Sequence, residues 1–169
     1  MSQAPLPPPK RRTEQLERLA RPFPARLIHN NPSGGGSFVR HSVVTEKLLA
    51  VVGPFDFALV QIVRGQVDGK APNPASKSAR GKAGMSMLAD AIVGAVCRLT
   101  VEVDGRRTSV EEVGDCEDPH NWPHDGARLK DAMSDALKRC AMRLGVTLHL
   151  WSGDEFTLYK QLGEQKADQ

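Results

Sequence analysis

Basic side chains gather along one side of residues 125–145, the most regular segment of this sequence. At about 100° per residue, Arg139 and Arg143 lie one helical turn apart on the flank of an apolar face. Arg128 falls near the same flank almost three turns earlier, and Lys138 points further toward solvent. Guanidinium and ammonium groups placed in this way can bind the phosphates of a polyanion. The alternative is a solvated helix rim that contacts only water.

The segment that positions these cations is predicted to be an amphipathic helix. Asp125 is a suitable N-cap, and Gly145 is a suitable residue just past the last turn. One stripe is apolar, with the i, i+3, i+4 spacing of a core-facing surface. Its members are Leu129, Ala132, Met133, Ala136, Leu137, Cys140, Ala141 and Leu144. We therefore expect the helix to bury this stripe and to present basic groups along its edge.

Three strands are predicted before that helix. Residues 55–65, 91–103 and 106–114 show the alternation of half-buried strands, and Asp104-Gly105 is a strong hairpin turn. The predicted inward face of the second strand comprises Ala95, Cys97, Leu99, Val101 and Val103. This order predicts an α+β fold, in which a three-stranded antiparallel β-meander packs against the long helix. The result would be a β-β-β-α core with flanking short helices.

The flanking segments are predicted to be short helices. Thr13 can cap a helix that ends before Pro22, and Ser42 can cap a helix over residues 42–53. A last helix is predicted to begin with the capping box Ser152–Glu155. The residues expected to face inward in the first two helices are Leu16, Leu19, Val44, Leu48, Val51 and Val52.

Residues 13–162 are expected to form one domain, between a disordered Pro-rich basic tail at 1–12 and a disordered C-terminus at 163–169. The polar loop at 65–86 carries several basic residues, and its length favours a flexible arm that contacts DNA. Charge is uneven, because residues 1–110 carry 16 Lys and Arg against 8 acidic residues. Residues 111–169 carry 7 Lys and Arg against 12 acidic residues. This asymmetry suits a polyanionic partner.

Composition excludes several classes of protein. With 40% hydrophobic and 25% charged residues, the chain is typical of a soluble domain. No apolar run reaches the roughly 18–20 residues of a membrane span, and the N-terminus lacks the apolar core of a signal peptide. Three cysteines without a CxxC pair fit reduced thiols. We therefore expect a cytoplasmic protein with no membrane contact and no disulfide framework.

Several of these motifs together resemble the Rad-fifty-two-type single-strand annealing proteins. The stretch EEVG follows a DG hairpin and precedes a helix containing DALKRCAMRLG. EEVG is similar to the D-V-G-like strand end of that family, and DALKRCAMRLG is similar to its D-G-L-K-R-A-type helix motif. The Leu-rich helix, the GGG turn before a capped helix and the V-G-x-V-C-type opening of the long strand occur in family order. The resemblance covers roughly residues 14–162.

The resemblance implies subunits that assemble into rings, single-stranded DNA bound in a basic groove around the ring, and ATP-independent annealing of complementary strands. Lys138 and Arg139 match the family's Lys-Arg pair, and Arg143 lies one position after a family arginine. Ala136 replaces the family's glycine, and a shorter connection before the helix contains Trp122. The resemblance does not extend to the long C-terminal half of the eukaryotic members.

The resemblance further implies a compact bacterial or phage-like protein that acts on DNA in recombination and repair. Its expected protein partners are a single-strand-binding protein or an exonuclease. Annealing makes no covalent bond, so we expect no enzyme activity, catalytic residue, metal or cofactor. In this function, lysine and arginine side chains hold the phosphates while the bases stay free to pair. Because the sequence has few aromatic residues, base stacking is expected to contribute less than these backbone contacts. The predicted nucleic-acid-binding residues are Lys138, Arg139, Arg143, Arg128, Arg98, Arg80 and Lys82.

Three alternatives stay open at this point. Cys116, His120 and His124 could belong to the metal site of a nuclease, although Pro119 and Pro123 favour a rigid surface turn. An α-β-β-β-α order also describes double-stranded RNA-binding domains, but their basic residues lie at the start of the last helix. In the third alternative, a ring-forming scaffold uses its rim charges only for subunit contacts.

Overall fold

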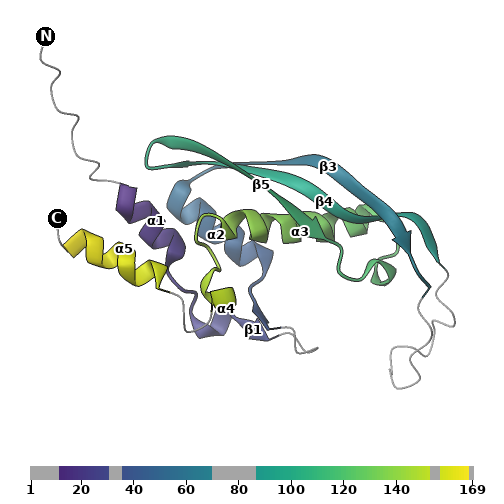
Figure 1. The fold of residues 1–169 in the computed structure, drawn as a ribbon, viewed down its shortest axis with the longest axis horizontal. Coiled ribbons are helices and arrows are strands. Elements are labelled where there is room, and N and C mark those ends of the chain that lie inside the picture. Colours follow the sequence, from purple (N-terminus) through teal and green to yellow (C-terminus); the bar gives the residue numbers. More distant parts are fainter. Residues whose placement is uncertain (1–11, 31–35, 70–86, 153–156, 168–169) are drawn as a thin grey trace, which may run out of the picture. The chain divides into compact units, whose positions relative to one another are not determined.

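The fold class is α+β, as predicted (Figure 1). In this computed structural model, strands β3 (Asp56–Val67), β4 (Leu88–Val103) and β5 (Arg106–Asp115) form an antiparallel sheet in the order β3-β4-β5. Helix α3 (Asp125–Met142) follows the sheet in sequence. The structure describes residues 12–30, 36–69, 87–152 and 157–167.

Shorter elements flank this core. They are α1 (Arg12–Ala20), η1 (Ala25–Leu27), β1 (His29–Asn30), β2 (Ser37–Phe38), α2 (His41–Val52), η3 (Pro119–Asn121), α4 (His149–Ser152) and α5 (Leu158–Ala167). Strands β1 and β2 pair with each other in a separate small hairpin. Helix α5 extends past residue 162, the expected end of the domain. Of the predicted disordered tail at 1–12, Arg12 belongs to α1 and the rest lies outside the described residues, as does most of the basic loop at 65–86.

The chain divides into two compact units, and each is described by itself. The first unit comprises residues 1–56, 99–110 and 140–169. The second comprises residues 57–98 and 111–139. Both units therefore contain residues from the segment 13–162, for which one domain was expected.

The core of the second unit is built from small residues. Ala95 and Cys97 of β4 pack with Ala132 and Ala136 of α3, and all four are fully buried. Because these side chains are small, the helix and the sheet approach closely. Around this cluster lie Cys116, Phe57, Leu129 and Met133. The predicted inward face of β4 is confirmed, since Ala95, Cys97, Leu99, Val101 and Val103 are all buried.

The hairpin between β4 and β5 belongs to the first unit and confirms the turn predicted from Asp104-Gly105. Asp104 has φ 53° and Gly105 has φ 72°. Positive φ at both central residues defines a type I′ turn, whose twist matches that of the flanking strands. Further along the two strands, the hydroxyl groups of Thr100 and Ser109 lie 2.9 Å apart.

Helix α3 starts one residue after its cap, which is His124 and not the predicted Asp125. The carbonyl of His124 accepts a hydrogen bond from the backbone N–H of Arg128 at 3.2 Å. Its Nδ1 accepts another from the N–H of Ala127, also at 3.2 Å. Imidazole nitrogen thus replaces the side-chain oxygen that usually satisfies the first turn. The predicted N-cap is wrong by one residue because the carboxylate of Asp125 is engaged elsewhere.

The C-terminal end of α3, which lies in the first unit, confirms the role predicted for Gly145. Gly145 has φ 89°, and its N–H donates to the carbonyl of Met142 at 2.9 Å. The N–H of Val146 donates to the carbonyl of Ala141 at 3.1 Å. This pair of bonds is a Schellman motif, which satisfies the last helical carbonyls and favours glycine at the left-handed position.

The first unit also contains the packing of α1 against α2. Leu19 of α1 and Leu48 of α2 are fully buried, as predicted. Gln15 Nε2 donates to the carbonyl of Val51 at 3.1 Å, and Arg18 Nη2 donates to that of Ala50 at 2.9 Å. These two bonds satisfy carbonyls in the last turn of α2. Of the other predicted inward residues, Val44 is buried, whereas Leu16, Val51 and Val52 are half-buried.

Three further predicted helix starts are wrong. Thr13 does not cap the first helix, because α1 already includes Arg12. Helix α2 begins at His41 with Arg40 as N-cap and without a side-chain capping bond, so Ser42 lies inside its first turn. Ser152 does not open the last helix, because it is the final residue of α4 and its hydroxyl donates to the carbonyl of Leu148 at 2.9 Å. The other half of that predicted capping box, Glu155, lies outside the described residues.

Lys47 of α2 is an unusually desolvated lysine in the first unit. Its Nζ lies 4.4 Å from the centroid of the Phe23 ring and donates to the carbonyl of Arg21. Burial, and then the positive charge of Arg21, lowers the pKa of Lys47 from 10.5 to about 8. The folded state therefore holds this proton less tightly than the unfolded state does.

Lys47 should make the folded protein more stable as the pH rises above 8. A lysine whose pKa is lowered by folding disfavours the folded state at neutral pH, and that effect is relieved between pH 8 and 10.5. Urea unfolding at pH 7 and pH 9.5 should therefore show the stability of the wild type rising relative to that of Lys47→Met. Equal changes with pH in the two proteins would contradict this assignment.

Candidate nucleic-acid interface

Lys138 and Arg139, two of the predicted DNA-binding residues, are neighbours on α3 in the second unit. Lys138 Nζ lies 3.3 Å from Asp135 Oδ1, and Arg139 Nε donates to Asp135 Oδ2 at 2.7 Å. Their side chains are 33% and 44% exposed, so both reach solvent while one carboxylate holds them. The spacings i, i+3 and i, i+4 bring all three side chains to one side of the helix. The structure thus presents an oriented pair of cations.

Acidic groups surround this pair. Burial acts to raise the pKa of Asp135, but the hydrogen bond from Arg139 and the charge of Lys138 outweigh it, and the pKa is lowered. The hydrogen bond to Asp135 raises the pKa of Arg139, with further contributions from the charges of Asp135, Asp115 and Glu112 against desolvation. Three carboxylates therefore act on two cations. The local positive field is therefore weaker than expected from the basic residues of the helix flank alone.

Arg98 points outward from β4, as predicted, and is paired across the sheet with Glu111 of β5. Its Nε and Nη2 lie 2.7 Å and 2.6 Å from the same oxygen, Glu111 Oε1. Both side chains are close to half exposed. A phosphate would therefore have to compete with this carboxylate for the guanidinium, so Arg98 is a weaker candidate than the α3 pair.

Arg128 has a structural role in place of the predicted contact with phosphate. Only 9% of its side chain is exposed. Its Nε donates to the carbonyl of Pro119 at 2.9 Å, and its Nη2 donates to that of Trp122 at 3.0 Å. Its Nη1 donates to Asp125 Oδ1 at 3.0 Å. A guanidinium directed at three internal partners is not available to DNA, and we remove Arg128 from the interface.

Arg143, Arg80 and Lys82 complete the predicted set. Arg143 is exposed just after α3, in the first unit, whereas the Lys138–Arg139 pair belongs to the second. The other two residues lie in the segment 70–86, outside the described residues. Among the predicted residues that the structure describes in the second unit, Lys138 and Arg139 are the two that share a partner, Asp135.

Sequence reasoning missed Arg64 of β3. Its Nη1 donates to the carbonyl of Asp90 at 2.6 Å and lies 3.0 Å from Asp125 Oδ2. Desolvation acts to raise the pKa of Asp125. Hydrogen bonds from the Ile92 N–H and from Arg128, together with Arg64, nevertheless lower it. Asp125 thus joins the strands to the start of α3. In the sequence, Arg64 is a single arginine in an apolar strand, and that pattern alone does not reveal its acidic partner Asp125.

The turn before α3 uses its histidines to hold the backbone. His120 is buried, and its Nε2 lies 2.8 Å from the carbonyl oxygen of Asp68, while His124 caps α3. Burial, and then Asp131, raises the pKa of Cys116 to about 11. In the described part of the chain, no three His, Cys, Asp or Glu side chains meet in a metal-binding group. The turn interpretation is therefore favoured over a metal site.

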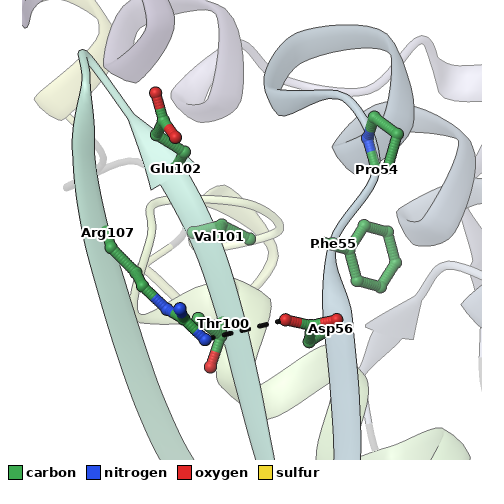
Figure 2. Close-up of a pocket in the computed structure, with 7 residues that line it drawn as sticks. All are labelled: Pro54, Phe55, Asp56, Thr100, Val101, Glu102 and Arg107. Atoms are coloured by element: carbon green, nitrogen blue, oxygen red, sulfur yellow. Dashed lines mark ion pairs between the residues drawn. The ribbon is translucent and has the colours of Figure 1, made fainter.

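An open pocket of about 260 Å³ lies in the first unit (Figure 2). It is lined by Pro54, Phe55, Asp56, Thr100, Val101, Glu102 and Arg107. Asp56 and Arg107 point toward each other, with their charged atoms 3.8 Å apart, and both are about 80% exposed. None of the predicted site residues lines this pocket. Its Asp56–Arg107 ion pair is exposed and therefore weak, and it does not indicate any particular ligand.

No protein-family model and no curated protein matches this chain. The resemblance to single-strand annealing proteins therefore depends on the motifs in the sequence, and the function below is a proposal. Among the helices that the structure describes, none has the length and apolar character needed to cross a membrane.

Proposed function

We propose that this protein binds single-stranded DNA and anneals complementary strands without ATP. The observation that carries the proposal is the exposed Lys138–Arg139 pair, held in place by Asp135 on a helix that packs against a sheet in the second unit. The motif DALKRCAMRLG, which carries the family resemblance, contains all three residues. Both cations reach solvent, whereas Ala132 and Ala136 on the same helix are buried.

The geometry suits contact with the DNA backbone. Lysine and arginine bind phosphates by charge-assisted hydrogen bonds and do not occupy the base edges. A strand held in this way keeps its bases available for pairing, so annealing needs no nucleophile and no nucleotide cofactor. Asp135 limits the number of orientations that the two cations can adopt, which reduces the entropy lost when they bind DNA. Each subunit offers few such contacts, so the proposal also requires several subunits along one strand.

We also propose that the protein is a homo-oligomer. Strand β3 is an edge of the sheet, and Leu59, Val60 and Ile62 on it are 39%, 45% and 39% exposed. Adjacent residues of a strand point to opposite sides, so this edge is uncovered on both. Pairing of β3 with β5 of the next copy would be head-to-tail, the arrangement that generates rings where the rotation closes and filaments where it does not. Light scattering should give a multiple of 18.4 kDa, and a monomer would contradict the proposal.

Annealing of two complementary fluorescent oligonucleotides, without nucleotide or metal, tests the main proposal. The wild type should accelerate annealing, and Lys138→Ala with Arg139→Ala should reduce both the annealing rate and the affinity for a single strand at least tenfold. Because each subunit loses two phosphate contacts, the slope of log affinity against log salt should become shallower by about 1.4 for every subunit that contacts the strand.

The matched control is Lys130→Ala with Lys160→Ala, which removes the same charge. Both lysines are exposed. Lys130 lies nine residues before Arg139 on α3 and therefore points to the opposite side of the helix. We expect this control to retain most of the affinity. Equal losses in the two double variants would show a net-charge effect and contradict the assigned interface. No acceleration by the folded wild type would reject annealing itself.

A further inference from the structure

Trp122 is an exposed aromatic residue on a rigid turn of the second unit. It lies between the 3₁₀ helix η3 and the start of α3, and 37% of it is exposed. Isolated apolar side chains at the surface are common and need no explanation by themselves. The surroundings of Trp122 distinguish it, because they fix its backbone and leave part of the residue exposed to solvent.

Three features fix that backbone. The N–H of Trp122 donates to the carbonyl of Pro119 at 3.3 Å, and its carbonyl accepts from Arg128 Nη2 at 3.0 Å. Arg128 Nε also donates to the Pro119 carbonyl, so one guanidinium closes the turn at both ends. Pro123 follows Trp122 and restricts it to the extended conformation, observed as φ −104° and ψ 132°. The turn is therefore fixed before any ligand arrives.

The guanidinium that holds the turn is almost fully buried. Burying a charge is costly unless it is paired and hydrogen-bonded, and Arg128 meets that cost through Asp125 and two carbonyls. Its bonds hold the main chain on both sides of an indole that stays accessible to solvent. An accessible aromatic ring on a fixed main chain can stack with an unpaired nucleobase, and the main chain has little conformational entropy left to lose.

We propose that Trp122 is a stacking site for one unpaired base of a bound single strand, and that Arg128 positions it. This inference rests on the proposed function. Asp125 and Lys138 lie about 20 Å apart along the axis of α3. A strand that follows the helix would thus meet a base contact near its first turn and phosphate contacts near its end. Stacking does not depend on base identity, so the site is compatible with annealing of any sequence.

The test compares a thymidine oligonucleotide with an abasic strand that has the same number of phosphates. Affinities are measured by fluorescence anisotropy for the wild type, Trp122→Ala, Trp122→Phe and Trp151→Ala. Trp122→Ala should weaken binding of the thymidine strand roughly tenfold and leave binding of the abasic strand unchanged. Trp122→Phe keeps a ring and should retain most of the affinity. Trp151 is 72% exposed and belongs to the first unit, so its variant controls for loss of a surface indole.

The two proposals fail in different ways. If Trp122→Ala binds both strands as the wild type does, the stacking site is overturned and the phosphate interface stands. If its affinities for the two strands fall equally, Trp122 supports the fold only, and the stacking site is again overturned. If the wild type binds neither strand, the proposed function is rejected and this inference with it. Arg128→Lys should reproduce part of the base-specific loss, because lysine cannot bridge both carbonyls.

Discussion

Replacing Gly114 with alanine should destabilise the second unit by about 3 kcal/mol or more. Gly114 lies in β5 directly under α3, and an added Cβ would overlap the carbonyl oxygen of Ala132 and the backbone nitrogen of Ala136. It would also lie 2.9 Å from Ala136 Cα. All of these atoms belong to the helix backbone, so no side chain can rotate away. Urea unfolding followed by circular dichroism should show a much lower midpoint.

Gly163→Ala is the matched control. Gly163 lies inside α5, and an added Cβ there would meet no atom within 4 Å. Alanine is favoured over glycine within a helix, so this variant should gain about 0.5–1 kcal/mol. If Gly114→Ala were as stable as the wild type, α3 would have to lie further from β5 than the structure shows. The glycine of the EEVG motif is thus explained by packing, whatever the protein binds.

Periodicity and turn chemistry were sufficient to predict the central elements from sequence. Cys97, Leu99, Val101 and Val103 alternate with polar residues, and the structure buries all four. Asp104-Gly105 predicted the hairpin because few other residue pairs adopt positive φ at two successive positions. Gly145 predicted the end of α3 for a similar reason. Each of these predictions depends on residues close together in the chain.

Predictions that depended on distant partners were less successful. Asp125 has the chemistry of an N-cap, but Arg64 of β3 and Arg128 draw its carboxylate away, and His124 caps the helix instead. Ser152 followed by Glu155 fits a capping box in sequence, yet Ser152 ends a short helix. In both cases a local preference was overridden by tertiary contacts that a single sequence does not reveal.

The structure differs most from the predicted interface in the acidic partners of the basic residues. Helix geometry placed Lys138 and Arg139 on an accessible flank, but it did not show that Asp135 bonds to both or that Arg98 pairs with Glu111. Paired cations give less attraction to DNA than free ones, since a phosphate must compete with the carboxylate. One subunit should therefore bind weakly. Tight binding would come from repetition of the same contact around an oligomer.

Removal of the Arg128 guanidinium should cost about 1–3 kcal/mol of stability for each backbone carbonyl that is left without its hydrogen-bond donor. Arg128→Met keeps most of the side-chain volume but leaves the carbonyls of Pro119 and Trp122 without their donor. Arg98→Met is the control, because it also removes a guanidinium bound to a carboxylate. That pair is about half exposed and should contribute at most about 1 kcal/mol. Urea unfolding of the two variants measures the difference.

The same pair of variants distinguishes the two roles considered for Arg128. A phosphate ligand on the helix flank would be dispensable for folding, so its loss would weaken DNA binding and leave the urea midpoint unchanged. The buried network predicts the reverse order of effects, with a large loss of stability as the primary result. Full stability of Arg128→Met together with a shallower salt dependence of DNA binding would return Arg128 to the interface. The structural assignment would then be wrong, because a side chain only 9% exposed cannot serve DNA without leaving its three partners.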